Sequence, residues 1–370
     1  MLEYLFIAFI VIFCIQCVFY LVIFGNFALS KTIIQNKNFK QAVSVIICAK
    51  NEAENLKKNI PYFLEQEYIN FEIVLINDAS RDASLEIMEQ FKSNHPSKIK
   101  IVDVAPNEQF WGSKKYALTL GIKAASNEYL LFSDADCKPV SKNWIQEMVN
   151  NFSNNKQLVL GYGSYTKIKN SFLNKLIRFE TLITAVQYFS YAKIGIPYMG
   201  VGRNLGYTKS TFFNANGFVN HMHRIKSGDD DLFINQVATK NNTTYCISKD
   251  SFTESSPKTS FKNWLQQKRR HISTALYYKT IHKYLLGLFF SSQLLFWLLS
   301  IILLCFQFNL VYILLIIVLR QIFFFLSIGF SAKKLNETDL ILFLPFYEIF
   351  LIIIQMLIFI KNLISKPTHW

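Results

Sequence analysis

Apolar residues are distributed unevenly along the chain, with long runs at its two ends and short runs separated by polar segments between them. Tyr4–Phe27 is nearly uncharged and long enough to cross a bilayer as a helix. Similar runs lie at about Leu285–Phe306, Leu310–Phe330 and Leu340–Ile360. The pattern predicts a transmembrane anchor within residues 1–30 and about three transmembrane helices within residues 284–362.

The first apolar run could also be a cleaved signal peptide. Such a peptide has a basic segment before its apolar run and an Ala-x-Ala-like site after it, and neither is present here. The run is therefore interpreted as a retained membrane anchor.

The central region alternates predicted strands with predicted helices. Ala42–Cys48 and Phe71–Ile76 are the apolar, β-branched runs of strands buried on both faces, and a third apolar run ends at Phe132. Leu85, Met88 and Phe91 recur at helical spacing after the second strand. This alternation is typical of a parallel sheet, in which ligands bind beyond the carboxyl ends of the strands.

Polar residues follow each of these three strands. Ala49–Glu52 follows the first strand, Asn77–Ser80 the second and Ser133–Asp136 the third. Asp134 and Asp136 lie two residues apart and project to one side of an extended backbone. Hard oxygen ligands suit Mg²⁺ or Mn²⁺, which can neutralise a diphosphate. Taken alone, two aspartates at this spacing are also common at a solvated strand end.

Several motifs, taken in order, resemble those of family 2 glycosyltransferases. They are Val45–Glu52, Leu75–Ser80, Gly112–Leu118, Ser133–Asp136, Gly202–Tyr207, Asn216–Phe218, Ser227–Leu232 and Gln267–His271. The resemblance covers about residues 41–280 and implies a nucleotide-sugar-binding domain of the GT-A type. The expected fold class is α/β, with a mostly parallel sheet and membrane-spanning helices at both ends of the chain.

The resemblance also implies which residues contact a nucleotide-diphosphate sugar. Asn51 and Glu52 correspond to donor-side residues, and Asp78 to the residue that contacts the base or ribose. Lys114 corresponds to the diphosphate-side lysine. The alternatives are a turn or N-cap role for Asp78 and an ordinary surface position for Lys114.

The two aspartates of Ser133–Asp136 have different expected roles. Asp136 is expected to ligate the metal directly, and Asp134 to contact the ribose or to take a second position at the metal. The expected cofactor is Mg²⁺ or Mn²⁺, with a UDP-sugar as the favoured donor.

The family's register assigns the catalytic base to Asp230, with Asp229 as the fallback. An inverting transfer needs a carboxylate to take the proton of the acceptor hydroxyl, and neighbouring carboxylates raise the pKa of at least one member of the run. The alternative is a solvated helix start, where acidic residues favour the helix dipole.

Gln267, Arg270 and His271 resemble the family's Gln-x-x-Arg-Trp motif, which lies over diphosphate and acceptor. A shifted register, with Gln266, Arg269 and Arg270, fits as well. His271 replaces the usual tryptophan, and we expect its smaller ring to favour addition of one or a few sugars over long polymers.

The segment around Gln267–His271 has a simpler interpretation, as a basic amphipathic helix on the membrane surface with Trp264 as its anchor. Phe172–Lys193 also has an apolar helical stripe. Core packing is its expected role, and a membrane-facing helix that admits a lipid acceptor is the alternative.

The positions of basic residues predict the orientation in the membrane. They gather after the first span, before the second, and between the third and fourth, at Lys31, Lys37, Lys40, Lys279, His282, Lys283, Lys333 and Lys334. The catalytic domain is therefore expected to be cytoplasmic, at a bacterial-type inner (plasma) membrane. Lys361 and Lys366 would then lie outside, so a re-entrant fourth run, broken by Pro345 and Glu348, is an alternative.

Composition adds two constraints. The formal net charge is +14, but Lys and Arg are spread along the chain without a nucleic-acid-binding motif, so anionic lipid and a nucleotide diphosphate are the expected anionic partners. The six cysteines lack metal or disulfide spacing and are expected to be reduced packing residues.

One charged pair is expected inside the membrane. Arg320 and Glu348 are the only residues of the Lys, Arg, Asp and Glu types within the last three apolar runs, and their depths from the shared membrane face are similar. They are expected to form an ion pair between neighbouring helices. In the alternative, Arg320 extends to the interface and Glu348 is protonated.

The expected function is an inverting glycosyltransferase that moves a sugar from a nucleotide-diphosphate sugar to a glycan or lipid-linked acceptor at the membrane. The alternative is a membrane-anchored scaffold that binds nucleotide sugar without catalysis. A transporter fits less well, because the motifs lie outside the four apolar runs. The sugar, the acceptor and the linkage are not specified by short motifs.

Overall fold

The computed structural model describes residues 1–31, 39–105, 114–225 and 227–365. The chain divides into two compact units: an α/β unit of residues 32–167 and 195–258, and a helical unit of residues 1–31, 168–194 and 259–370. The predicted positions Lys37, Gly112, Ser113 and Lys366 lie outside the described residues.

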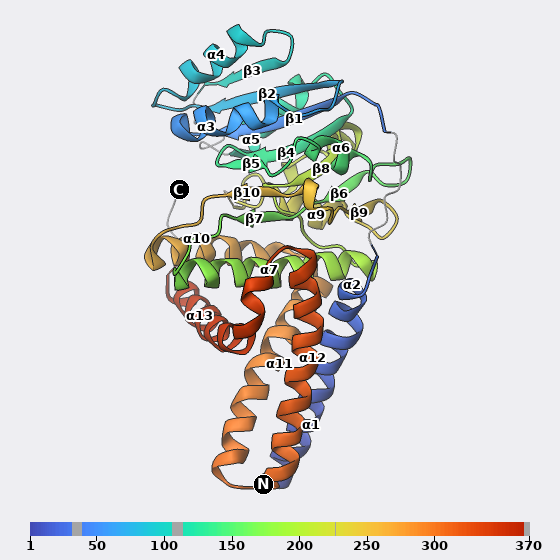
Figure 1. Cartoon of the computed structure of the whole chain (residues 1–370), viewed down its shortest axis with the longest axis vertical. Helices are drawn as coiled ribbons and strands as arrows, with labels where there is room; N and C mark the ends of the chain where they lie inside the picture. The colour runs from blue at the N-terminus through green and yellow to red at the C-terminus, as the bar shows by residue number, and fades with distance from the viewer. Residues whose placement is uncertain (32–38, 106–113, 226, 366–370) are drawn as a thin grey trace. The chain divides into compact units, whose positions relative to one another are not determined.

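The α/β unit is built on a seven-stranded sheet with the order β3-β2-β1-β4-β8-β6-β9 (Figure 1). Its strands are β1 (Val43–Ala49), β2 (Phe71–Asp78), β3 (Ile99–Val104), β4 (Tyr129–Asp134), β6 (Leu158–Leu160), β8 (Leu205–Thr208) and β9 (Thr243–Tyr245). All pairs are parallel except the two that β8 makes with β4 and β6. The expectation of an α/β fold with a mostly parallel sheet is confirmed.

The strand register explains why the polar segments meet. Ala49 of β1 pairs with Asn77 of β2, and Cys48 of β1 pairs with Asp134 of β4. The carboxyl ends of these three parallel strands therefore lie at one edge of the sheet. Apolar residues such as Ile47 and Leu75 are fully buried within the same strands and hold this edge in place.

Helices follow the strands of the α/β unit. They are α3 (Ala53–Leu64), α4 (Ser84–Asn94), α5 (Lys114–Ala124), α6 (Trp144–Val149), α8 (Lys209–Asn214) and α9 (Asp231–Val237), with single 3-10 turns at Val219–His221 and Lys249–Ser251. A second, three-stranded sheet has the order β5 (Cys137–Pro139), β10 (Thr253–Ser255), β7 (Gly163–Tyr165). Because β5 begins directly after Asp136, this small sheet continues from the acidic end of β4.

Among the residues that the structure describes, the helical unit contains four helices long and apolar enough to cross a membrane. The first, Leu2–Ala28, is continuous through α1 (Leu2–Cys17), a π-helical stretch η1 (Val18–Phe24) and α2 (Gly25–Ala28). The others are α11 (Thr280–Cys305), α12 (Leu310–Lys334), and α13 (Leu344–Ile364) with the 3-10 segment η6 (Thr338–Phe343) before it. The four predicted spans are thus present as helices.

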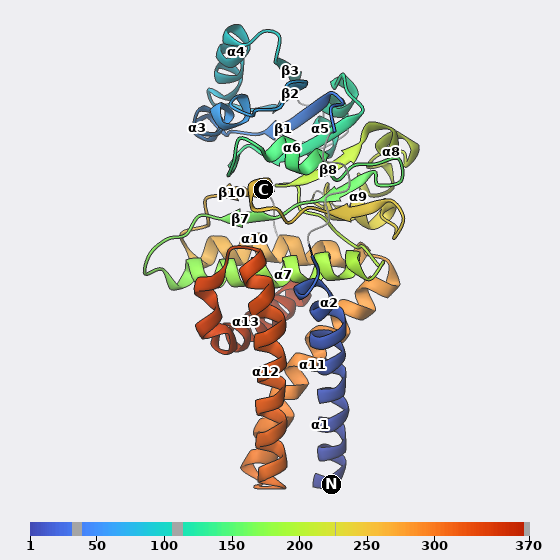
Figure 2. The same ribbon diagram turned by 45° about the vertical axis from the view of Figure 1, so that its right-hand side comes forward.

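Two further helices belong to this unit, α7 (Phe172–Lys193) and α10 (Phe261–Thr274), the latter followed by a 3-10 turn at Ala275–Tyr277. In both views α1, α11 and α12 run side by side, whereas α13 lies next to α7 and α10 (Figures 1 and 2). Arg178 of α7 connects this helix to η6. Its guanidinium binds Glu337, which directly precedes η6, and Asp339 within η6.

The pairing expected within the membrane helices is confirmed. Arg320 of α12 donates to both carboxylate oxygens of Glu348 of α13, with Nη1 to Oε2 at 2.5 Å. Arg320 also donates to Tyr20 Oη at 2.8 Å and Gln16 Oε1 at 2.9 Å, and Gln293 Nε2 donates to Glu348 at 2.9 Å. This buried polar cluster therefore connects all four apolar helices.

Candidate active site

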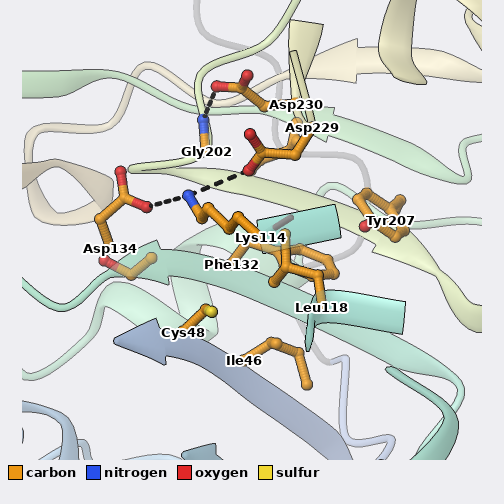
Figure 3. Close-up of a pocket in the computed structure, with 12 residues that line it drawn as sticks. Ile46, Cys48, Lys114, Leu118, Phe132, Asp134, Gly202, Tyr207, Asp229 and Asp230 are labelled. Carbon is orange, nitrogen blue, oxygen red and sulfur yellow. Dashed lines mark hydrogen bonds and ion pairs between the residues drawn. The ribbon is translucent and has the colours of Figure 1, made fainter. Parts of the chain in front are cut away.

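A pocket opens at the carboxyl ends of β1 and β4, between these strands, the start of α5 and the start of α9 (Figure 3). The charged side chains that line it are Lys114, Asp134, Asp229 and Asp230. Its apolar lining is formed by Ile46, Leu118, Phe132, Leu205 and Tyr207. The structure thus brings together charged residues that lie up to 116 positions apart in the sequence, from Lys114 to Asp230.

Lys114 bridges two carboxylates across this pocket. Its Nζ lies 2.8 Å from Asp134 Oδ1 and 3.0 Å from Asp229 Oδ2. Burial opposes the charge, but the two carboxylates outweigh burial and hold the pKa of Lys114 well above its usual range. The charged form of Lys114 is therefore favoured between the two acidic segments, unlike that of an isolated surface lysine, and its contact with a diphosphate stays a prediction.

Asp134 and Asp136 remain close enough to share a cation. One oxygen of each and the Cys137 sulfur lie within 4.8 Å of one another. Burial, and then the neighbouring Asp134, raise the pKa of Asp136, which indicates a site that favours a positive charge. Burial also raises the pKa of the Cys137 thiol, so it stays protonated and is a weak ligand. Two hard carboxylates without a thiolate fit Mg²⁺ or Mn²⁺.

Asp230 is held by backbone N–H groups at the start of α9. Its Oδ2 accepts from the Gly202 N–H at 2.5 Å and its Oδ1 from the Asp231 N–H at 2.8 Å. A side chain at position 202 would lie 3.3 Å from Asp230 Oδ2, so glycine permits this close approach. Burial, followed by the charges of Asp229 and Asp231, raises the pKa of Asp230 to about 7. A carboxylate with this pKa can accept a proton near neutrality.

The predicted donor-side residues form the loops after β1 and β2. The Asn51 side-chain oxygen accepts from the Arg81 N–H at 2.8 Å, and the Glu52 N–H donates to Ser84 Oγ at 2.9 Å. Burial raises the pKa of Glu52, with smaller contributions from the charges of Asp136 and Asp134. Glu52 therefore lies within electrostatic range of the acidic pair.

Asp78 ends β2 and is buried. Its Oδ2 lies 3.4 Å from Lys50 Nζ, and the N-cap residue of α4 is Ala83, so the N-cap interpretation of Asp78 is wrong. Burial raises the pKa of Asp78, and Lys50 opposes this shift. A buried acceptor at a strand end is consistent with nucleotide contact, which stays a prediction.

Gln267, Arg270 and His271 lie on α10 in the helical unit. The neighbouring Arg269 binds the C-terminal part of α13, with Nε to Asn362 Oδ1 at 2.8 Å and Nη2 to the Ser365 carbonyl oxygen at 2.6 Å. Arg269, a member of the shifted register, is thus engaged with α13, and which of the two registers contacts the ligands stays a prediction. Trp264 is fully buried, which does not fit a tryptophan anchored in lipid.

Three residues of this region were not singled out by the sequence. Lys50 pairs with Asp78, Tyr207 stacks on Phe132 with ring centroids 4.2 Å apart, and Arg203 stacks on Tyr165. Arg203 and Tyr207 both fall in Gly202–Tyr207, one of the ordered motifs. The motif could have drawn attention to Arg203 and Tyr207, but its sequence does not indicate which of their side chains lies near Asp134 and Asp136.

Comparison with known proteins identifies the domain. Residues 44–216 match glycosyl transferase family 2. The chain is similar to a poly-beta-1,6-N-acetyl-D-glucosamine synthase of Staphylococcus epidermidis, with 38% identity over 96 residues. This alignment covers 26% of the chain and 22% of the synthase. The chain is also similar to an uncharacterized glycosyltransferase of Haemophilus influenzae, with 34% identity over 128 residues. This alignment covers 34% of the chain and 37% of that protein. The chain thus spans well under half the length of these relatives.

The fold has a counterpart among solved structures. The mannosyltransferase PcManGT from Pyrobaculum calidifontis, in complex with GDP-Man and Mn²⁺, superposes with a TM-score of 0.60 over 94% of this chain and 99% of that chain. The sequence identity is 14%, so the likeness concerns the fold.

Proposed function

This chain belongs to glycosyl transferase family 2 and has the GT-A fold, and we propose that it is a metal-dependent, inverting enzyme that glycosylates a glycan or a lipid-linked acceptor at a membrane. The donor is a nucleotide-diphosphate sugar. Four candidate membrane helices support a membrane location, and the distribution of basic residues supports a cytoplasmic catalytic domain.

One observation carries the proposal: Lys114 contacts Asp134 on one side of the pocket and Asp229 on the other. Asp134 begins the predicted metal segment, and Asp229 precedes the predicted base. A donor diphosphate held at the first and an acceptor hydroxyl held at the second would therefore lie within a few ångströms of each other, as a direct displacement requires.

The chain's own residues account for the proton and the charges of this displacement. The acceptor oxygen attacks the anomeric carbon, the bond from that carbon to the diphosphate oxygen breaks, and the nucleoside diphosphate leaves with the electron pair. Asp230 takes the hydroxyl proton, and the N–H groups of Gly202 and Asp231 orient its carboxylate. Lys114 offsets the negative charge of the diphosphate.

Asp136 and Asp134 would hold the divalent cation, with Glu52 near them. The cation supplies electrostatic stabilisation of the departing diphosphate. Asn51 and Asp78, at the ends of β1 and β2, would contact the nucleoside, and Gln267, Arg270 and His271 the diphosphate or acceptor.

The number of sugars added per acceptor is a separate proposal. His271 offers a smaller stacking surface than tryptophan, so we expect one or a few additions. The relatives named as synthases of a polysaccharide favour the other outcome. Product length from purified protein decides between them, because long polymer formed without other proteins contradicts the short-product proposal.

The proposed activity is tested with the detergent-purified full chain. It is incubated with a panel of nucleotide sugars and Mn²⁺ or Mg²⁺, with and without membrane lipids, and nucleotide release is measured. We expect one donor to be consumed and the rate to rise with a lipid or glycan acceptor. Binding of nucleotide sugar without turnover under every condition would support the non-catalytic scaffold instead.

A further inference from the structure

Arg203 is positioned beside the acidic pair by the small sheet. Its guanidinium carbon lies 4.4 Å from the centre of the Tyr165 ring, and its Nη1 donates to Ser255 Oγ at 3.3 Å. Tyr165 of β7 and Ser255 of β10 are register partners, and Ser255 also pairs with Cys137, the residue after Asp136. The guanidinium therefore contacts residues that lie side by side across the small sheet with Cys137, which directly follows Asp136.

The backbone and a glycine hold the arginine in this place. The Arg203 carbonyl oxygen accepts from Thr253 Oγ1 at 2.9 Å and Ser133 Oγ at 3.2 Å. A side chain at Gly163 would lie 3.0 Å from Arg203 Cβ and 3.2 Å from its Nε. A side chain at Gly163 would therefore press on Arg203, and the glycine leaves room for Arg203 to lie against β7.

The guanidinium of Arg203 makes few contacts with hydrogen-bond acceptors of the described residues. A guanidinium has five N–H donors, and within the described ranges Ser255 is the one hydrogen-bond acceptor of the Arg203 guanidinium and no carboxylate forms an ion pair with it. Arg178 and Arg320, which are fully buried, behave differently: Arg178 binds Glu337 and Asp339, and Arg320 binds Glu348. An arginine that only stabilised the fold would be expected to pair as these do.

The charges around Arg203 indicate what it can bind. Asp136 and Asp134 lie within electrostatic range, and Arg203 offsets part of the rise that burial and Asp134 cause in the pKa of Asp136. A cation held by the two carboxylates would leave Arg203 next to a positive centre. The planar N–H donors of a guanidinium match the oxygens of a phosphate group, which carries the opposite charge.

We propose that Arg203 binds phosphate oxygens in the active site, as a binding residue additional to Lys114 and the acidic pair. The inference rests on the proposed function and names a further contact of the same site. The phosphate could come from the donor diphosphate or from a phosphate group on a lipid-linked acceptor. Both present the same chemistry to the guanidinium, and the experiment separates them.

The first arm measures the donor side. Binding of UDP and GDP in the presence of Mn²⁺ is titrated calorimetrically for the wild type, Arg203→Gln and Arg203→Lys. Loss of a charge-assisted, forked contact should weaken diphosphate binding about 10- to 100-fold in Arg203→Gln, with partial recovery in Arg203→Lys. Lys142→Gln is the matched control, because it removes one positive charge from an exposed pair with Glu65.

The second arm measures the acceptor side. Turnover is followed with a polyprenyl phosphate and with the polyprenol of the same length. A 10- to 100-fold rise in KM for the phosphate alone, with unchanged UDP and GDP binding, would assign Arg203 to the acceptor phosphate. A change in diphosphate binding alone would assign it to the donor.

A readout of Mn²⁺ alone separates binding from a structural role. If Arg203 acted only by balancing Asp134 and Asp136, Arg203→Gln would bind Mn²⁺ more tightly and leave both phosphate arms unchanged. Effects in both arms no larger than those of Lys142→Gln would overturn the inference while the proposed function stands. A wild type that binds neither nucleotide and turns over no sugar would overturn both.

Discussion

At the residue scale, carboxylates that look alike in sequence have different surroundings in and beside the pocket. Asp136 lies with Asp134 in a group of ligand atoms that could hold a metal ion, Asp229 pairs with Lys114, and Asp230 accepts hydrogen bonds from two backbone N–H groups. Because these carboxylates have different partners, substitutions of them should affect different steps, such as donor binding or turnover, and by different amounts.

Asp136→Asn and Asp230→Asn should therefore have different effects. Asp136→Asn should abolish the metal-dependent part of donor binding, because it removes the carboxylate expected to ligate the cation directly. Asp230→Asn should leave donor binding nearly intact and lower turnover by orders of magnitude, because only proton transfer is affected. Calorimetry with donor and Mn²⁺, alongside initial rates, measures the two effects. Wild-type turnover in Asp230→Asn would show that the base is another residue.

The raised pKa of Asp230 predicts the pH dependence of turnover. The base acts when deprotonated, so kcat/KM should rise with pH and level off above about 7. Asp229→Asn removes a negative charge that helps to raise the pKa of Asp230, so the rising limb should move to lower pH. Asp250→Asn, which removes an exposed carboxylate outside the pocket, serves as the control. An unmoved limb with retained activity in Asp229→Asn would contradict the role of these neighbouring charges.

At the element scale, α10 is held within the helical unit by consecutive basic residues that bind different helices. Lys268 forms an ion pair with Glu180 of α7, and Arg269 binds Asn362 and Ser365 at the end of α13. These contacts leave Gln267, Arg270 and His271 on a helix fixed from two directions. The positions of these three side chains should then depend on Arg269 although Arg269 is not expected to touch substrate.

Arg269→Ala should loosen α10 without removing any predicted binding residue. Charge-assisted hydrogen bonds contribute about 1.5–3 kcal/mol when well formed, and the partial exposure of Arg269 reduces this to about 1 kcal/mol. We expect faster amide exchange in α10 and a several-fold fall in kcat/KM, measured by hydrogen exchange and initial rates. Lys262→Ala, on an exposed position of the same helix, is the control. Equal exchange in the two variants would refute the anchoring role.

At the scale of the whole molecule, a buried polar cluster connects the four apolar helices. Its members are Arg320, Glu348, Tyr20, Gln16 and Gln293, and apolar packing alone would not fix the positions of these helices relative to one another. In lipid, neighbouring helices gain little from burying apolar surface against each other, because lipid tails are equally apolar. A paired charge that is satisfied in only one arrangement can therefore select that arrangement.

Removing one member of the central ion pair should cost more than removing both. Arg320→Leu or Glu348→Leu leaves an unpaired buried charge, which typically costs about 3–5 kcal/mol, whereas the double substitution leaves none. Thermal unfolding in detergent should give the lowest Tm for the single variants and a partly recovered Tm for the double variant. Lys333→Gln, at the end of the same helix, controls for lost charge. A double variant no more stable than the worse single one would show that the two side chains are not energetically coupled.

Much of the fold could be predicted because it depends on local sequence. β-branched runs such as Ala42–Cys48 predict buried strands, and uncharged runs such as Tyr4–Phe27 predict membrane helices, from the chemistry of each segment alone. The ordered motifs identified the family for the same reason, since each is a short contiguous string. Asp134 and Asp136 could be selected as a pair because two positions in a strand share a face.

The tertiary structure decided which of these segments meet. No local pattern says that Lys114 bridges Asp134 and Asp229, or that Gly163 makes room for Arg203 against Tyr165, because each contact joins residues that are distant in the sequence. The domain limits of 41–280 remain a prediction, and α7 and α10 pack within the helical unit although motifs flank or include them. The physical reason is that helix and strand formation follow from local spacing, whereas ion pairs and stacking depend on where packing brings distant segments together.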